Sequence, residues 1–135
     1  ISLNPWIEVL KVNLIAPLLI TQSIIKNIEK SSEKRIYILS SKVGSIEDNK
    51  SGGMYVYRSS KTALNQIVKS LSIDLKPMGI SVISLHPGWV RTEMGGPNAL
   101  ISVEESVNGM FGVISNTNIS NSGQFLNYDG TEIPW

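Results

Sequence analysis

The chain has no cysteine and only one histidine, His86, among its 135 residues. Without cysteine there is no disulfide framework, no cysteine-based zinc site and no thiol nucleophile. A single histidine also excludes multi-histidine centres, so we expect no metal site. Excess charge of either sign is missing too, with 12 basic and 11 acidic residues. Because a nucleic-acid surface needs extra basic residues to neutralise phosphates, we expect no nucleic-acid partner.

Long hydrophobic runs are missing as well. The charge-free part of the first apolar segment covers residues 12–25 and contains Asn13 and Pro17, whereas a membrane span needs about 20 apolar residues. The opening letters ISLNPW lack the basic start of a signal peptide. We therefore expect a buried helix in this region, no membrane partner and a cytoplasmic location.

The chain does contain an alternation of helix and strand patterns. Hydrophobic residues make up 41% of it, which is enough for a folded core. Helical patterns and short β-rich runs alternate over about residues 5–28, 35–40, 54–76, 80–85, 103–114 and 123–128. Such alternation predicts parallel strands joined by right-handed crossovers, hence a doubly wound α/β sheet. We expect residues 1–135 to form one domain or the back half of one.

The first helix is expected to begin at Asn4 and Pro5, because asparagine is a favoured N-cap and proline fits the first helical position. Its apolar residues spread widely around the helix, which predicts burial on much of its surface. Pro17 is expected to bend it.

The strongest local signal for chemistry is the pair Tyr57 and Lys61. They are four positions apart, so they share one face of a helix. A nearby ammonium favours the phenolate form of a tyrosine, which suits it to general acid–base catalysis. The spacing alone is also that of an ordinary surface pair.

Two further signals lie where predicted parallel strands end, the place at which such sheets bind ligands. One is the serine pair Ser40 and Ser41, whose hydroxyls could donate to a substrate carbonyl oxygen. The other is the dipeptide Pro87-Gly88. Together with the tyrosine–lysine pair, these signals indicate one site at the carboxyl edge of the sheet.

In combination these residues resemble the short-chain dehydrogenases/reductases. The resemblance rests on Asn13, the two serines, the tyrosine–lysine pair and the strings SGGMYVYRSSKTALN, LHPGWVRTEMGG and DGTEIPW. The strings look like the branch that includes sniffer-type carbonyl reductases and C-factor-like proteins. The resemblance implies the C-terminal portion of a Rossmann-like fold and an NAD(P)-dependent oxidoreductase that interconverts a carbonyl and an alcohol.

The resemblance also implies four catalytic roles. Tyr57 would protonate the carbonyl oxygen, and Lys61 would support it and bind the nicotinamide ribose. Ser41 would hold and polarise the substrate oxygen, and Asn13 would help to bind the water of a proton relay. Ser40 remains an alternative to Ser41, and a satisfied buried amide remains an alternative role for Asn13.

The same resemblance implies cofactor contacts beyond the tyrosine and lysine. Pro87 and Gly88 would lie against the nicotinamide, and Val90 and Thr92 would contact its carboxamide, Val90 through its backbone. The expected cofactor is NADP, with NAD as the alternative, and the expected substrate is a small carbonyl compound or alcohol. When complete, the protein is expected to form a homodimer or homotetramer.

The sequence departs from the family in two places. It shows neither the TGxxxGxG turn, which binds pyrophosphate at a helix N-terminus, nor the NNAG segment. We therefore expect a fragment without the nucleotide-binding half, poorly stable and inactive alone and unable to bind a dinucleotide tightly. The spacing from Ser41 to Tyr57 is also longer than is common in the family.

Other readings stay open beside the enzyme. The chain could be a truncated, non-enzymatic C-factor-like protein that acts in signalling or interaction. His86 is interpreted as structural because no serine–aspartate partnership is visible for a hydrolase triad. Arg58 and Arg91 are expected to be solvated or at the rim of the site, and Met110 to line a pocket or to pack in the core.

Overall fold

In the computed structural model, which describes residues 2–135, three parallel strands form one sheet in the order β1-β2-β3. The strands are β1 (Arg35–Leu39), β2 (Ser81–His86) and β3 (Phe125–Asn127). Leu39 lies opposite Leu85 in the first pair of strands, and His86 lies opposite Asn127 in the second. The predicted alternation of helices and parallel strands is confirmed.

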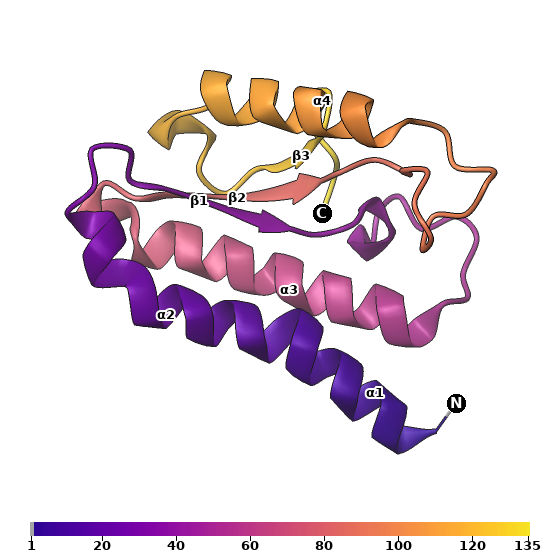
Figure 1. The fold of residues 1–135 in the computed structure, drawn as a ribbon. Coiled ribbons are helices and arrows are strands. Elements are labelled where there is room, and N and C mark those ends of the chain that lie inside the picture. The colour runs from indigo at the N-terminus through magenta and orange to yellow at the C-terminus, as the bar shows by residue number, and fades with distance from the viewer. Residues whose placement is uncertain (1) are drawn as a thin grey trace.

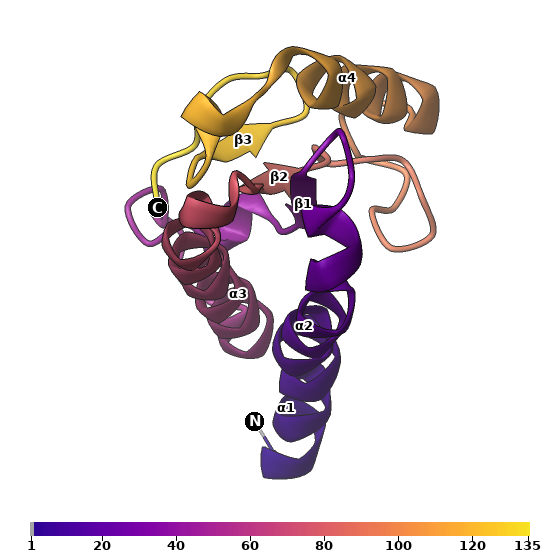
Figure 2. The same cartoon turned by 90° about the vertical axis from the view of Figure 1, so that its left-hand side faces the viewer.

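Helices cover both faces of this sheet, as Figures 1 and 2 show. They are α1 (Leu3–Leu10), α2 (Ala16–Glu29), α3 (Tyr55–Asp74) and α4 (Val103–Asn116). The first three lie on one face and α4 lies on the other. The sheet is therefore doubly wound, as the sequence predicts.

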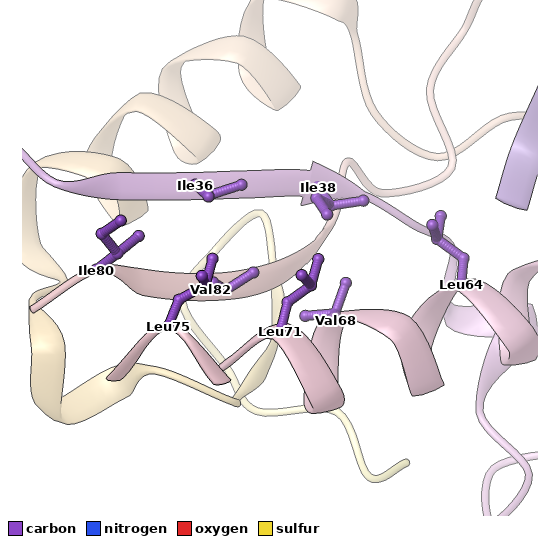
Figure 3. Close-up of a cluster of buried hydrophobic side chains, with 8 residues drawn as sticks. All are labelled: Ile36, Ile38, Leu64, Val68, Leu71, Leu75, Ile80 and Val82. Carbon is purple, nitrogen blue, oxygen red and sulfur yellow. The ribbon is translucent and has the colours of Figure 1, made fainter. Parts of the chain in front are cut away.

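Between α3 and the sheet lies a cluster of buried aliphatic side chains, drawn in Figure 3. Its members are Ile36, Ile38, Leu64, Val68, Leu71, Leu75, Ile80 and Val82. The α3 members recur every three or four residues, which places them on one side of a helix, and the strand members recur every two. This apolar side of α3 is the side that packs on the sheet.

A second cluster lies on the opposite face of the sheet, beneath α4. It contains Ile83, Leu85, Val113 and Leu126, with Tyr37 and Met110 packed against it. Met110 therefore packs in the core of this layer, one of the two roles that the sequence left open.

The first helix differs from its prediction at its start and in its burial. It begins at Leu3, after Ser2, rather than at Asn4. In α1 and α2 together only Thr21 is buried, and the side chains of Leu3 and Val12 are 71% and 67% exposed. The prediction of burial on much of the surface is wrong, because among the described residues one side of the helix packs on the α3 core.

Helices α1 and α2 are joined without a gap, so that Leu3–Glu29 runs as one helix of 27 residues. By length and composition this helix is apolar enough to cross a membrane, a test that the core helix of a soluble protein also passes. The sequence predicts the helix over about residues 5–28, but counting only charge-free residues underestimates the length of its apolar stretch. The absence of a membrane partner stays a prediction.

Candidate active site

The side chains of Tyr57 and Lys61 meet on the first turns of α3. Nζ of Lys61 lies 5.9 Å from the centre of the Tyr57 ring. The same ammonium donates to the carbonyl of Leu39 over 3.2 Å, at the carboxyl end of β1. Burial lowers the pKa of Lys61, because removal from water disfavours the charged form. The predicted pair therefore exists and lies at the carboxyl edge of the sheet.

The serine pair follows β1 directly, and its two members differ. Ser40 extends the sheet, since its N–H donates to the carbonyl of Leu85 over 2.9 Å. The Ser40 hydroxyl is buried and has no hydrogen-bond partner within residues 2–135. The Ser41 hydroxyl accepts from the N–H of Val43 at 3.4 Å and begins a short turn. Both serines are buried, at 4% and 9% exposure, so the choice of Ser41 over Ser40 as the residue that meets a ligand stays a prediction.

The turn after Ser41, Lys42–Gly44, lies directly against α3. A Cβ atom on Gly44 would lie 2.9 Å from the backbone carbon of Lys61 and 2.9 Å from its Cβ. The hydroxyl of Thr62 donates to the Gly44 carbonyl over 2.8 Å. Only a glycine allows this approach without a shift, so close main-chain packing fixes Ser41 relative to α3.

Asn13 is linked to the same part of α3. Its Nδ2 donates to the Ser60 hydroxyl over 3.1 Å, and that hydroxyl donates to the carbonyl of Tyr57 over 2.8 Å. Ser60 is fully buried. Because this chain of bonds leads to Tyr57, Asn13 is one part of the arrangement around the tyrosine–lysine pair.

The helix is irregular at Asn13. A π-helical turn covers Lys11–Ile15, and the N–H of Ala16 donates to the carbonyl of Lys11. Pro17 has no N–H, so the Asn13 carbonyl lacks its α-helical donor. Turns of this kind are frequent at functional sites. The π-helical turn therefore lies just before Pro17, and the bend expected at Pro17 stays a prediction.

Beside Ser40, the sheet ends at His86. Burial and the positive charge of Lys42 lower the pKa of His86 to about 4. Its Nδ1 atom is buried and has no hydrogen-bond partner in the part of the chain that the structure describes. The imidazole is therefore neutral at pH 7, and its structural role stays a prediction.

The segment after His86 passes between α4 and the end of β3. The hydroxyl of Ser106 donates to the Pro87 carbonyl over 2.5 Å. Gly88 has a φ of +86°, and a Cβ atom there would lie 2.5 Å from Cδ1 of Ile101. The hydrogen bond to the Pro87 carbonyl and the close packing at Gly88 hold the Pro87-Gly88 backbone at the carboxyl edge of the sheet.

Val90 forms an isolated parallel bridge with Ile101. The bridge uses the N–H of Arg91 and the carbonyl of Trp89, so the N–H of Val90 points away from Ile101. The N–H of Thr92 donates to the Val90 carbonyl over 2.8 Å. Val90 therefore presents a backbone donor on the side away from the bridge.

Of the two arginines expected to be solvated or at the rim of the site, Arg91 is exposed and Arg58 is half-buried, and both are bonded to main-chain atoms. Arg91 donates through Nη1 to the carbonyls of Ala99 and Leu100 over 3.3 and 3.2 Å. Arg58 donates to the loop between β1 and α3. The sequence pattern missed these contacts, because the acceptors are backbone carbonyls and a serine hydroxyl that carry no charge signal.

The last residue of the chain, Trp135, also contacts this loop. Its carbonyl accepts from the N–H groups of Ile46 and Glu47 over 3.2 and 3.1 Å and from the Ser45 hydroxyl over 3.3 Å. The indole ring stacks on Phe125 with 5.5 Å between ring centres. The sequence predicted the strand that contains Phe125, but no local signal connects it with the loop.

Comparisons with known proteins agree with this geometry. Residues 1–100 match the short chain dehydrogenase family. C-signal of Myxococcus xanthus is 44% identical over 124 residues, which cover 92% of this chain and 75% of that protein.

Two solved structures superpose on the whole chain. Carbonyl reductase Sniffer of D. melanogaster has a TM-score of 0.96 at 37% identity, and this chain covers 59% of it. An NADPH-bound carbonyl reductase from chicken fatty liver has a TM-score of 0.93 at 37% identity, and this chain again covers 59% of it. The predicted Rossmann-like class and the resemblance to sniffer-type reductases and C-factor-like proteins are confirmed.

Proposed function

Because the chain belongs to the short chain dehydrogenase family, we propose that residues 1–135 are the C-terminal catalytic part of an NAD(P)-dependent oxidoreductase. The reaction would interconvert a small carbonyl compound and an alcohol. The proposal rests on one arrangement, in which three predicted residues lie around the same part of α3. Lys61 lies beside the Tyr57 ring, the turn after Ser41 packs on Lys61, and Asn13 is bonded to the same helix.

In this proposal each residue has its own role in carbonyl reduction. Tyr57 donates its phenolic proton to the substrate oxygen as negative charge develops there. Ser41 donates a hydrogen bond to the same oxygen. The Lys61 ammonium stabilises the phenolate left behind, and Asn13 helps to hold the water through which the proton is replaced. The reduced nicotinamide, when bound, would supply the hydride.

The proposed cofactor is NADP, supported by the NADPH-bound reductase that superposes on the chain. The residues present fit a nicotinamide. The N–H of Val90 is turned away from its bridge partner and would suit a carboxamide oxygen, with the Thr92 side chain beside it. Pro87 and Gly88 would border the ring, and Lys61 would hold the ribose.

A second candidate function is association without turnover, as in a truncated C-factor-like signalling protein. The likeness to C-signal and the exposed apolar side chains of α1 and α2 favour it. In the enzyme proposal the same exposed surface, with α3, would form the interface of a homodimer or homotetramer located in the cytoplasm.

A titration with NADPH separates the two functions. We expect the complete polypeptide that contains these residues to bind NADPH with micromolar or tighter affinity, followed by the quenching of its tryptophan fluorescence. The 135-residue polypeptide alone is expected to bind far more weakly, because it has no glycine-rich phosphate turn. A folded complete polypeptide that does not bind NADPH would support association instead.

A further inference from the structure

The loop between β1 and α3 receives three hydrogen bonds from one side chain, that of Arg58. Nη1 donates to the carbonyl of Val43 over 3.0 Å. Nη2 donates to the Ser51 hydroxyl over 2.8 Å, and Nε donates to the carbonyl of Gly52 over 3.2 Å. The first acceptor lies near the start of the loop and the other two lie near its end, so a single guanidinium joins both ends.

The end of this loop has little packing of its own. Gly52 and Gly53 both have a φ of +66°, and a Cβ atom on either would meet no atom within 4 Å. Met54 follows with a φ of +49°, which is uncommon for a residue other than glycine. The segment, which leads into α3 (Figure 1), is held by the bonds from Arg58 and by one bond from the N–H of Gly52 to the Asn49 side chain.

Arg58 is placed to connect this loop with the proposed catalytic pair. It follows Tyr57 directly in α3, as Thr62 follows Lys61. The helix therefore carries two neighbouring pairs with a spacing of four residues. Tyr57 and Lys61 contact each other, whereas Arg58 and Thr62 both donate to the turn that follows Ser41.

We propose that Arg58 is a positioning residue, which sets the Ser41 hydroxyl relative to Tyr57 and Lys61 by holding both ends of the loop. The inference rests on the proposed function. The guanidinium suits this task because its donors form a rigid planar fork, whereas a lysine ammonium is a point charge on a flexible stem. The long spacing between Ser41 and Tyr57 leaves a long loop, and within the described part of the chain only this side chain bonds its two ends together.

The middle of the loop has a separate attachment, which lets the clamp be removed without loss of the whole loop. Ser45, Ile46 and Glu47 are bonded to the carbonyl of Trp135. Removing the Arg58 side chain therefore loosens the two ends, which keep the bonds from Thr62 to Gly44 and from Gly52 to Asn49, while the middle stays bound.

The test uses Arg58→Ala and Arg58→Lys in the complete polypeptide. We expect kcat for carbonyl reduction to fall about 10- to 100-fold in Arg58→Ala, the range for a misplaced reacting group, with a smaller fall in Arg58→Lys. The KM for NADPH is expected to stay within about twofold, because no cofactor contact is removed. Backbone amides of Gly44 and Gly52, which lie at the two ends of the loop, should exchange hydrogen faster in both variants, whereas that of Asp48 should not.

Arg35→Lys is the matched control. Arg35 also donates to two main-chain carbonyls, those of Ile114 and Thr117, over 2.8 and 3.2 Å, but it lies at the start of β1, away from the site. Its variant is expected to keep the wild-type kcat. An equal loss of kcat in Arg35→Lys and Arg58→Lys would overturn a positioning role.

A double-variant cycle with Ser41→Ala separates the inference from the function on which it rests. If Arg58 acts through Ser41, adding Arg58→Ala to Ser41→Ala lowers kcat by less than about twofold further. If the losses of kcat in the two single variants multiply in the double variant, the inference alone is overturned. It is also overturned if Arg58→Ala keeps the wild-type kcat while Ser41→Ala is slow. A wild-type kcat in Ser41→Ala overturns the proposed role of Ser41, and the inference with it.

Discussion

Tyr57→Phe is expected to lower kcat of the complete polypeptide by about 10²- to 10⁴-fold, the usual contribution of general acid–base catalysis. The substitution removes one oxygen and keeps the ring. The ring of Tyr57 still lies beside Lys61, and the backbone carbonyl of residue 57 still accepts from Ser60. We therefore expect the fold and the affinity for NADPH to change little.

Tyr55→Phe is the matched control for this experiment. Tyr55 lies in the same helical turn, and its side chain is 65% exposed. Removing its hydroxyl is expected to leave kcat unchanged, measured from the rate of NADPH consumption. Near-normal turnover in Tyr57→Phe would remove that residue from its proposed role.

A fall of stability in mild acid is the second large effect, and it arises at His86. The pKa of this imidazole in the folded protein is lowered from 6.5 to about 4 by burial and by Lys42. Between these pH values the unfolded chain binds a proton that the folded chain does not. The free energy of unfolding therefore falls as the pH falls through this window, by up to about 3 kcal/mol. Above pH 6.5 the titration of His86 does not change the free energy of unfolding.

Urea unfolding of the wild type and His86→Gln at pH 7 and pH 4.5 measures this effect. We expect the wild type to lose more stability than the variant. Asp129, whose pKa is lowered by hydrogen bonds from Thr131, is present in both proteins and so does not affect the comparison between them. Equal losses in both proteins would show that His86 is not the responsible group.

The sequence predicted the framework of the fold because that framework follows local periodicity. In α3 the buried leucines and Val68 recur at helical spacing, and in β1 the nearly continuous apolar run from Ile36 to Leu39 marks a strand of a parallel sheet. The carboxyl-edge position of Ser41 and Pro87 followed from the order of strands alone. These features need no knowledge of distant contacts.

What the sequence could not predict depends on contacts between distant segments. The apolar pattern of α1 and α2 shows which residues avoid water, but not which surface covers them, and Val12 and Leu19 are exposed in the structure. The clamp by Arg58 uses backbone carbonyls of Val43 and Gly52 as acceptors. Every residue has such a carbonyl, so no residue type at a fixed spacing signals the bond.

The most direct test of the proposed reaction is the stoichiometry of turnover. The complete polypeptide is incubated with NADPH and a panel of small aldehydes and ketones, and both the loss of reduced nicotinamide and the alcohol formed are measured. We predict that at least one carbonyl compound is reduced, with one alcohol formed for each NADPH consumed. A folded polypeptide that binds NADPH but reduces none of them would contradict carbonyl reduction by this site.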